Sequence, residues 1–323
     1  MTVVAAWVVG RGLLGKHLES AFEAQWPGCI HRSTAPHAWH DESALRAAFS
    51  ADVAALAQRV RAAGGGTVLI AWTAGLGVIG SPHQVLARDE MALRLLLDEI
   101  APNETVAEAG MLFVASTAGG AWGGSADRPI TERSAVAPIT EYGHARLRLE
   151  DRVGRWLDEH QGWRGLIGRI STLYGPGQNL HKAQGFISQV SRAAIFDRPI
   201  NVFVSLDTLR DFLFAPDCAA LVADSIRLLL MRPTSNRCEL KIFADEQSVS
   251  LLQVVAAVTR VCKHQVRVTT APAAHPGTQA PALVFRSVAL PEPRIRRTDL
   301  IAGVYLLYQH QLRLFREGRL APL

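Results

Sequence analysis

The stretch Val8-Val9-Gly10-Arg11-Gly12-Leu13-Leu14-Gly15 ends an apolar run, Val3–Val9, and opens an amphipathic segment at residues 13–24. It therefore has the order strand, turn, helix. Gly10 suits the tight turn, Gly12 lets a pyrophosphate approach the backbone, and Gly15 lets the helix press on the sheet. The amino end of the helix adds N–H groups and a partial positive charge, which favour phosphate. The whole segment from Gly10 to Gly15 is predicted to hold the pyrophosphate of a dinucleotide.

The residues after the second expected strand indicate which dinucleotide is bound. An NAD enzyme places Asp or Glu there, about 20 residues after the glycines. This chain has Cys29-Ile30-His31-Arg32-Ser33 instead. Arg32 suits a ribose 2′-phosphate because of its charge and planar fork, and Ser33 suits it as a hydrogen-bond partner. We expect NADP in preference to NAD; the alternative is that Arg32 is an ordinary surface arginine.

Short apolar runs alternate with longer amphipathic runs through the first half of the chain. Strands are expected at Val3–Val9, Thr67–Trp72, 111–115 and 165–170, and helices at 13–24 and 85–100. This alternation predicts an α/β fold with a doubly wound parallel sheet of the Rossmann type and right-handed crossovers. The site is expected at the carboxyl ends of the strands.

The alternation breaks after Tyr174-Gly175-Pro176-Gly177. We assign residues 1–174 to the dinucleotide-binding domain, with a return to that domain at residues 209–235. Residues 175–208 and 236–323 are expected to form a smaller C-terminal lobe that binds the substrate.

The composition indicates a globular protein and narrows its partners. The 323 residues are 49% hydrophobic and 20% charged, which is ample for a large core and argues against disorder. The net charge of +5 suits an anionic small molecule, and no nucleic-acid partner is expected because no Lys/Arg-rich run is interleaved with aromatics. No membrane association is expected either, because no apolar run reaches roughly 18 residues.

Cysteine and histidine usage completes the compositional picture. Four scattered cysteines with no Cys-x-x-Cys pair indicate a reduced, cytoplasmic chain. His31, His37, His40 and Asp41 form a histidine-rich patch whose spacing fits no metal-ligand pattern, so no metal site is expected.

A tyrosine with a cation one helical turn later forms a second candidate site. Ser116-Thr117 follows the strand at 111–115, and Tyr142-Gly143-His144-Ala145-Arg146 opens a later helix. A tyrosine with a pKa near 10 is a poor base at neutral pH. A nearby cation lowers that pKa, and a hydroxyl donor steadies both phenolate and substrate oxygen. Residues four apart share one helix face, so residue 146 is placed to serve Tyr142.

This arrangement resembles the extended short-chain dehydrogenase/reductases, specifically the NAD(P)-dependent sugar-nucleotide epimerase/dehydratase family. That family has Ser or Thr at the end of its fifth strand and Tyr-x-x-x-Lys at the start of the next long helix. Thr117 matches the first by position, with Ser116 as the adjacent alternative, and Tyr142 lies 25 residues after Thr117, as the family pattern requires. The resemblance implies that Tyr142 moves the substrate's hydroxyl proton and that Thr117 holds the oxygen.

Further matches extend the resemblance over residues 1–260. The segment Ala71-Trp72-Thr73-Ala74-Gly75 stands where the family has the loop after its fourth strand. The segment Arg169-Ile170-Ser171-Thr172-Leu173-Tyr174-Gly175-Pro176 is similar to the family's Arg-x-x-Asn-x-Tyr-Gly-Pro, with Thr172 in the Asn place. Arg210-Asp211-Phe212 is similar to the family's Arg-Asp-Phe.

These matches imply contacts for cofactor and substrate. Cofactor contacts are implied for Trp72, Thr73, Ala74, Tyr142, Arg146 and Ile170. Substrate contacts are expected for Ser116, Trp122, Thr172 and Arg210. Among these, Arg210 is the candidate for a substrate diphosphate, because of its charge and its place in the motif.

The chain departs from the family at residue 146, which is Arg in place of Lys. Arginine keeps the positive charge, but its planar fork is wider and differently aimed. Three interpretations stay open. Arg146 takes the lysine's role with altered activity, another cation such as Lys182 replaces it, or Tyr142 performs no redox chemistry and the protein binds its cofactor structurally.

The resemblance implies hydride transfer between nicotinamide C4 and a carbon of a nucleotide-linked sugar, with epimerisation, dehydration or reduction as the outcome. It also implies a homodimer through the helices near residues 85–100 and 142–160, where Leu149, Val153, Trp156 and Leu157 form an apolar stripe. Two alternatives remain: an NADPH-dependent reductase of a small non-sugar carbonyl compound, and a cofactor-binding pseudoenzyme.

Overall fold

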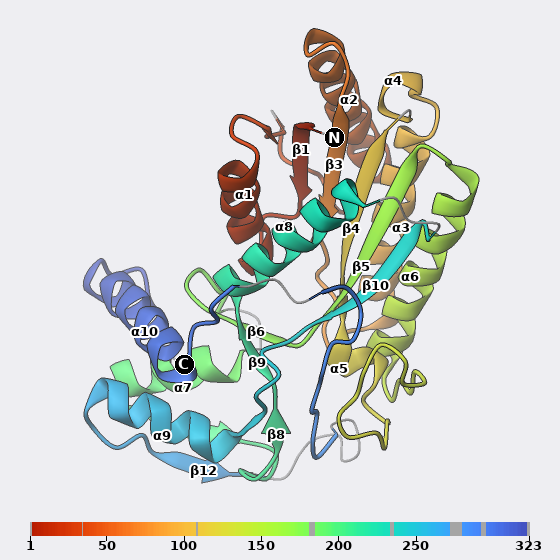
Figure 1. Ribbon diagram of the computed structural model, residues 1–323. Helices are drawn as coiled ribbons and strands as arrows, with labels where there is room; N and C mark the ends of the chain where they lie inside the picture. The colour runs from red at the N-terminus through yellow and green to blue at the C-terminus, as the bar shows by residue number, and fades with distance from the viewer. Residues whose placement is uncertain are drawn as a thin grey trace.

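The centre of the molecule is a six-stranded parallel sheet (Figure 1). The computed structural model describes residues 2–33, 35–107, 109–180, 185–232, 236–271, 280–291 and 295–321. In spatial order the strands are β10 (Cys238–Phe243), β5 (Trp163–Ile170), β4 (Gly110–Thr117), β3 (Thr67–Trp72), β1 (Val3–Val9) and β2 (Ile30–His31). The strand order reverses at β1, which has β2 on one side and β3 on the other. The prediction of a doubly wound α/β fold is therefore confirmed.

Helices cover both faces of the sheet, as the alternation of buried side chains along β1 requires. Ala5, Trp7 and Val9 pack with one set of helices, and Ala6 and Val8 with the other. The first set is α2 (Glu42–Ala62), α3 (His83–Ile100), the short α4 (Glu104–Ala107) and α6 (Glu141–Glu159). The second is α1 (Leu13–Gln25) and α8 (Ala215–Met231), which pack on each other. Another short helix, α5 (Ala118–Ala121), follows β4 directly.

A smaller lobe with its own apolar core lies beyond the carboxyl ends of the strands (Figure 1). Its helices are α7 (Phe186–Ile195), α9 (Leu251–Cys262) and α10 (Leu300–Arg316). Three strand pairs complete it and join it to the sheet: β6 (Thr172–Tyr174) with β9 (Phe212–Phe214), β7 (Ile200–Val202) with β12 (Val268–Thr270), and β8 (Leu209–Arg210) with β11 (Val249–Ser250). The lobe therefore combines segments from both sides of α8.

One boundary of the expected domain division is corrected. Residues 236–323 were assigned to the lobe, yet β10 runs parallel to β5 as the sixth strand of the central sheet. The strand's sequence, Cys-Glu-Leu-Lys-Ile-Phe, contains two charged residues and so lacks the apolar run expected of a buried strand. Lys241 is nevertheless buried. The Lys241 ammonium donates to Ser287 Oγ at 2.8 Å, so a later segment of chain partners this charge at the edge of the sheet.

The apolar stripe on α6 is used within the chain. Leu149, Val153, Trp156 and Leu157 are buried in the same core as α2 and α3, where they cover the sheet. The stripe is therefore not an exposed surface for a partner. No helix in the described ranges has the length and apolarity that a membrane span needs.

Candidate functional site

The glycine loop joins β1 to α1 at the point where the strand order reverses, and each glycine has a geometric reason. Gly10 has φ +98°, and a Cβ there would stand 2.4 Å from the backbone nitrogen of Ala74. A Cβ at Gly15 would stand 2.1 Å from the carbonyl oxygen of Gly10, so the helix presses directly on the turn. A Cβ at Gly12 would meet nothing within 4 Å. Gly12 thus faces open space at the amino end of α1, where a phosphate is expected.

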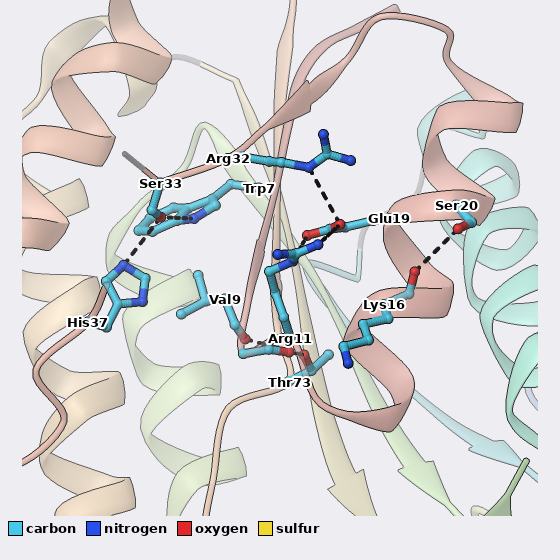
Figure 2. Close-up of polar contacts among 11 residues, drawn as sticks. Trp7, Val9, Arg11, Lys16, Glu19, Ser20, Arg32, Ser33, His37 and Thr73 are labelled. Carbon is cyan, nitrogen blue, oxygen red and sulfur yellow. Dashed lines mark hydrogen bonds and ion pairs between the residues drawn. The ribbon is translucent and has the colours of Figure 1, made fainter. Parts of the chain in front are cut away.

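The loop after β3, the neighbouring strand, is hydrogen-bonded to the glycine turn. Thr73 Oγ1 donates hydrogen bonds to the carbonyl oxygens of Val9 and Gly10, the first at 3.2 Å. Figure 2 shows Thr73 lying against the end of β1. Crevices at such a reversal, outside the carboxyl ends of parallel strands, are where open α/β sheets bind ligands.

A cavity of about 950 Å³ opens at this crevice. Most of the predicted site residues line it: Gly10, Arg11, Gly12, Leu13, Leu14, Trp72, Thr73, Ala74, Ser116, Thr117, Tyr142, Arg146, Ile170, Thr172 and Arg210. Four predicted residues do not: Gly15, Arg32, Ser33 and Trp122. Lys182 lies outside the described residues.

Two arginines meet one buried carboxylate beside the glycine loop. Glu19 Oε1 lies 2.7 Å from Arg11 Nε, and Glu19 Oε2 lies 3.7 Å from Arg32 Nε. The Glu19 side chain is 7% exposed, whereas those of Arg11 and Arg32 are 57% and 68% exposed. Figure 2 shows the Arg11 guanidinium against the Glu19 carboxylate, whereas Arg32 approaches it through Nε alone. The positive charges of the two arginines exceed the negative charge of Glu19, so a net positive charge remains where β2 ends.

Ser33 is engaged elsewhere, which differs from its predicted role. Its hydroxyl donates to Asp52 Oδ2 at 2.7 Å and accepts from Trp7 Nε1 at 3.1 Å. His31 and His37 also contact the Asp52 carboxylate. Although burial opposes ionisation, these hydrogen bonds hold the pKa of Asp52 at about 2. An ionised carboxylate is the stronger acceptor, which accounts for the direction of the Ser33 hydroxyl.

Thr117, Tyr142 and Arg146 line the cavity from β4 and α6. Thr117 ends β4, and its Oγ1 accepts from the Gly120 N–H at 3.1 Å. Thr140 caps α6 by accepting from the Gly143 N–H at 3.1 Å, which places Tyr142 in the first turn of the helix. One turn later the Arg146 guanidinium carbon lies 5.2 Å from the centre of the Tyr142 ring.

Ser116, the alternative to Thr117, is bound to a buried ion pair. Its Oγ donates to Glu150 Oε1 at 2.5 Å, and Glu150 in turn pairs with Arg169 at 2.6 Å. The Arg169 guanidinium carbon lies 4.4 Å from the ring of Trp122. Thr117 is therefore the better placed of the two hydroxyls.

Trp122 is corrected from a wall of the pocket to a core residue. It is fully buried, and its Nε1 donates to the carbonyl oxygen of Ser134 at 3.1 Å. The glycine-rich segment around Trp122 predicts a pocket lining. In the structure the indole instead stacks on the guanidinium of Arg169, which is paired with Glu150 in the interior.

Arg210 is the last residue of β8 in the smaller lobe, and it lines the cavity. Its Nη1 donates to the carbonyl oxygen of Leu209 at 2.8 Å. Burial lowers its pKa to about 10, so the guanidinium stays charged at neutral pH with little hydration. Thr172, Gln178 and Asn179 also line the cavity.

Sequence reasoning missed two charged residues of the cavity wall, Arg88 and Asp89 on α3. Asp89 lies between Arg88 and Glu90, and this charged run suggests a solvated helix face. The structure instead places the Asp89 carboxylate beside Arg146, with Oδ2 3.5 Å from Nη2. The signal in the sequence is a carboxylate three residues after Leu86 and four before Leu93, on the helix face that is otherwise apolar.

A sequence model of the NAD-dependent epimerase/dehydratase family matches residues 7–228. Among curated proteins, the dTDP-4-dehydro-6-deoxyglucose reductase of Escherichia coli is 28% identical over 105 residues. That match spans 32% of this chain and 33% of the reductase.

Solved structures share the fold over nearly the whole chain. UDP-glucose-4-epimerase from Stenotrophomonas maltophila, with bound NAD and formylated UDP-arabinopyranose, superposes with a TM-score of 0.77 at 17% identity, covering 97% of this chain and 99% of that one. RMD from Pseudomonas aeruginosa, complexed with NADPH, gives a TM-score of 0.73 at 17% identity, covering 96% and 98%. At these identities the likeness establishes the fold.

Proposed function

The chain belongs to the NAD-dependent epimerase/dehydratase family, and we propose that it is an enzyme that transfers a hydride to or from a nucleotide-linked sugar. The observation that carries the proposal is a shared cavity: the glycine loop, Thr117, Tyr142 and Arg146 all line it. A bound nicotinamide dinucleotide would supply the hydride chemistry.

The residues at the glycine loop fit a dinucleotide. No side chain caps the amino end of α1, so backbone N–H groups there face the cavity. The open space at Gly12 is a cradle that any side chain would fill. Gly10, Arg11, Gly12, Leu13 and Leu14 would hold the pyrophosphate, and Thr73 and Ala74 would flank it.

Tyr142 would move the proton of the substrate hydroxyl, with Arg146 stabilising the phenolate. Thr117 Oγ1 already accepts a hydrogen bond from the Gly120 N–H. Its own proton is therefore left to donate to the substrate oxygen. Arg210, a desolvated cation at the lobe side, would bind the substrate diphosphate.

Single-turnover absorbance tests the proposal. Protein loaded with oxidised or reduced dinucleotide is mixed with UDP-glucose or dTDP-4-dehydro-6-deoxyglucose, the compounds named for its relatives, and the reduced nicotinamide is followed. We expect a change with a nucleotide sugar and none with the free sugar, because the free sugar lacks the diphosphate for Arg210. No change with any nucleotide-linked sugar would contradict the proposed substrate class.

A second candidate, an NADPH-dependent reductase of a small non-sugar carbonyl compound, has one observation in its favour. Leu76, Ile79 and Ile139 line the cavity and are exposed, so part of its rim is apolar. Such a rim suits a less polar substrate than a sugar. The absorbance experiment separates the two candidates, because a small carbonyl compound needs no diphosphate for turnover.

For the cofactor, we propose NADP in preference to NAD, with Arg11 and Arg32 at the 2′-phosphate. Arg32 follows β2, whose pairing with β1 through Ala6 and Ile30 places it at the strand's end. Glu19 pairs closely with Arg11, which reduces the freedom that Arg11 would lose on binding phosphate, and its carboxylate lies 3.7 Å from Arg32. Residues 32 and 33 are not acidic, and the negative charge of Glu19 is exceeded by the charges of the two arginines beside it.

We expect NADPH to bind more tightly than NADH, and Arg32→Ala to remove most of the difference. A charge-assisted hydrogen bond to phosphate contributes about 1.5–3 kcal/mol, or roughly one to two decades of affinity. Calorimetric titration with both cofactors measures it. Arg155→Ala is the matched control, because Arg155 is an exposed arginine on α6 that pairs with Asp151. Equal affinities in the unmodified protein would refute the preference.

The homodimer implied by the resemblance stays a prediction, but not through the apolar stripe of α6. The outward faces of α3 and α6 carry an ion-pair network in which Arg148 contacts Glu90 and Glu141 at 2.7 and 3.0 Å. A dimer through these helices would therefore be polar and sensitive to salt. Light scattering is expected to give twice the chain mass, and a single-chain mass at micromolar concentration would exclude pairing.

A reducing, cytoplasmic location is proposed from the cysteines. Cys29, Cys218, Cys238 and Cys262 are all free thiols. Burial is the main cause that raises the pKa of Cys29 to about 11 and that of Cys238 to about 12, so both are poorly reactive.

A further inference from the structure

Asp89 makes three polar contacts at the cavity wall, and they join two separate segments of the chain. Oδ1 accepts from the Leu76 N–H at 3.0 Å and Oδ2 from the Gly77 N–H at 3.0 Å. Oδ2 also lies 3.5 Å from Arg146 Nη2. The carboxylate on α3 therefore ties the loop after β3 to the guanidinium on α6.

Gly75 shows how closely the loop and the guanidinium approach. A Cβ at Gly75 would stand 2.6 Å from Arg146 Nη2 and 3.0 Å from Asp89 Oδ2. The guanidinium thus lies directly on the loop backbone, in space that exists only because residue 75 has no side chain. The other side of the guanidinium faces the ring of Tyr142.

Burial makes the pairing necessary. The side chains of Arg146 and Asp89 are 10% and 11% exposed, so neither charge is well hydrated. A poorly hydrated cation needs a counter-ion and a defined position to be stable. Asp89 supplies both, because its carboxylate also accepts hydrogen bonds from the Leu76 and Gly77 N–H groups, which fix its position.

On the basis of the proposed function, we infer that Asp89 is a positioning residue that adapts this site to arginine at position 146. Asp89 sets the place and plane of the guanidinium beside Tyr142 and at the same time holds the loop of residues 75–77 over the cavity. Lysine is then a poor replacement, because a single ammonium does not provide the planar fork that lies between carboxylate, loop and ring.

A double-mutant cycle tests the inference, with Asp89→Asn, Arg146→Lys and the double variant. Three quantities are measured: the dissociation constant for NADPH, amide hydrogen exchange at Leu76 and Gly77, and the rate of single-turnover hydride transfer. Glu90→Gln is the matched control. Glu90 is the next residue on α3 and also bridges to α6, but through the exposed Arg148.

We expect each single variant to weaken cofactor binding and slow hydride transfer by roughly tenfold, and the double variant to cost no more than the worse single. Exchange at Leu76 and Gly77 should accelerate in Asp89→Asn, because asparagine keeps only one acceptor oxygen for the two N–H groups. Glu90→Gln should leave all three quantities unchanged.

The inference would be overturned if the losses of the two single variants multiplied in the double variant. An Asp89→Asn variant that behaves like Glu90→Gln would also overturn it. If Asp89→Asn does not fold, Arg146→Lys still decides, since parental affinity and rate in that variant would also overturn it. A parent that transfers no hydride contradicts the proposed function alone, because affinity and exchange still report on the pair. A parent that binds no cofactor leaves hydrogen exchange at Leu76 and Gly77 as the deciding measurement.

Discussion

Tyr142→Phe is expected to slow hydride transfer by roughly a hundredfold or more, the usual scale for a lost general acid or base. Cofactor affinity should stay near that of the parent. The ring stays in the variant, so the contact with the Arg146 guanidinium is kept. Only the phenolic oxygen is lost, and with it the group proposed to exchange a proton with the substrate. Single-turnover absorbance of the reduced nicotinamide measures the rate.

Tyr305→Phe provides the control for this substitution. Tyr305 is an exposed residue of α10, and it does not line the cavity, so the same chemical change there should leave the rate unchanged. A Tyr142→Phe variant as fast as the parent would refute the catalytic assignment. The structural interpretation would then gain, in which the protein binds a dinucleotide without using Tyr142 for chemistry.

The parts of the fold that could be predicted from the sequence depend on local patterns. The glycine loop is one, because the turn, the close approach and the helix start all lie within residues 10–15. The end of β2 is another: Ile30 and His31 form the strand, and Arg32 follows it. The tyrosine and the cation four residues later lie on one helix face, a geometry that any α-helix imposes.

The parts that could not be predicted depend on charges brought together by tertiary packing. Ser116 and Trp122 belong to a segment whose pattern predicts substrate contacts. In the structure Ser116 donates to Glu150, and Trp122 packs against Arg169, the partner of Glu150. Ser33 likewise turns to Asp52, 19 residues away on α2. The carboxylates that accept these hydrogen bonds, Asp52 and Glu150, lie 19 and 34 residues from Ser33 and Ser116, outside the local patterns. The acceptors that decide these orientations are therefore visible only in the folded chain.

The same limit explains β10 and Asp89. A strand that carries Glu239 and Lys241 does not have the apolar run expected of a sheet strand, yet Lys241 is buried and hydrogen-bonded. Asp89 lies in a charged run but falls on the inward face of α3. In both cases a partner distant in sequence makes burial of the charge tolerable.

Gly12→Val is expected to abolish dinucleotide binding while the fold stays intact. Gly12 has an extended backbone with φ −77° and ψ −154°, not the positive φ that requires glycine, and a Cβ there meets no atom within 4 Å. The amino end of α1 loses little, since Gly12 contributes no side-chain cap. The added methyl groups would instead occupy the space where the pyrophosphate must approach the helix. Calorimetry should detect no binding, and the melting temperature should stay within a few degrees of the parent's.

Comparison with other glycines shows why Gly12→Val tests ligand binding without disturbing the fold. Valine at Gly10 or Gly15 would collide with backbone atoms 2.4 and 2.1 Å away, so loss of binding there would report only on a damaged turn. Gly154→Val on α6 is the matched control, because a Cβ at that position also meets nothing within 4 Å and Gly154 does not line the cavity. If Gly12→Val binds the dinucleotide as tightly as Gly154→Val does, the pyrophosphate does not lie at the glycine loop. The proposed cofactor site would then be wrong even though the fold is a Rossmann fold.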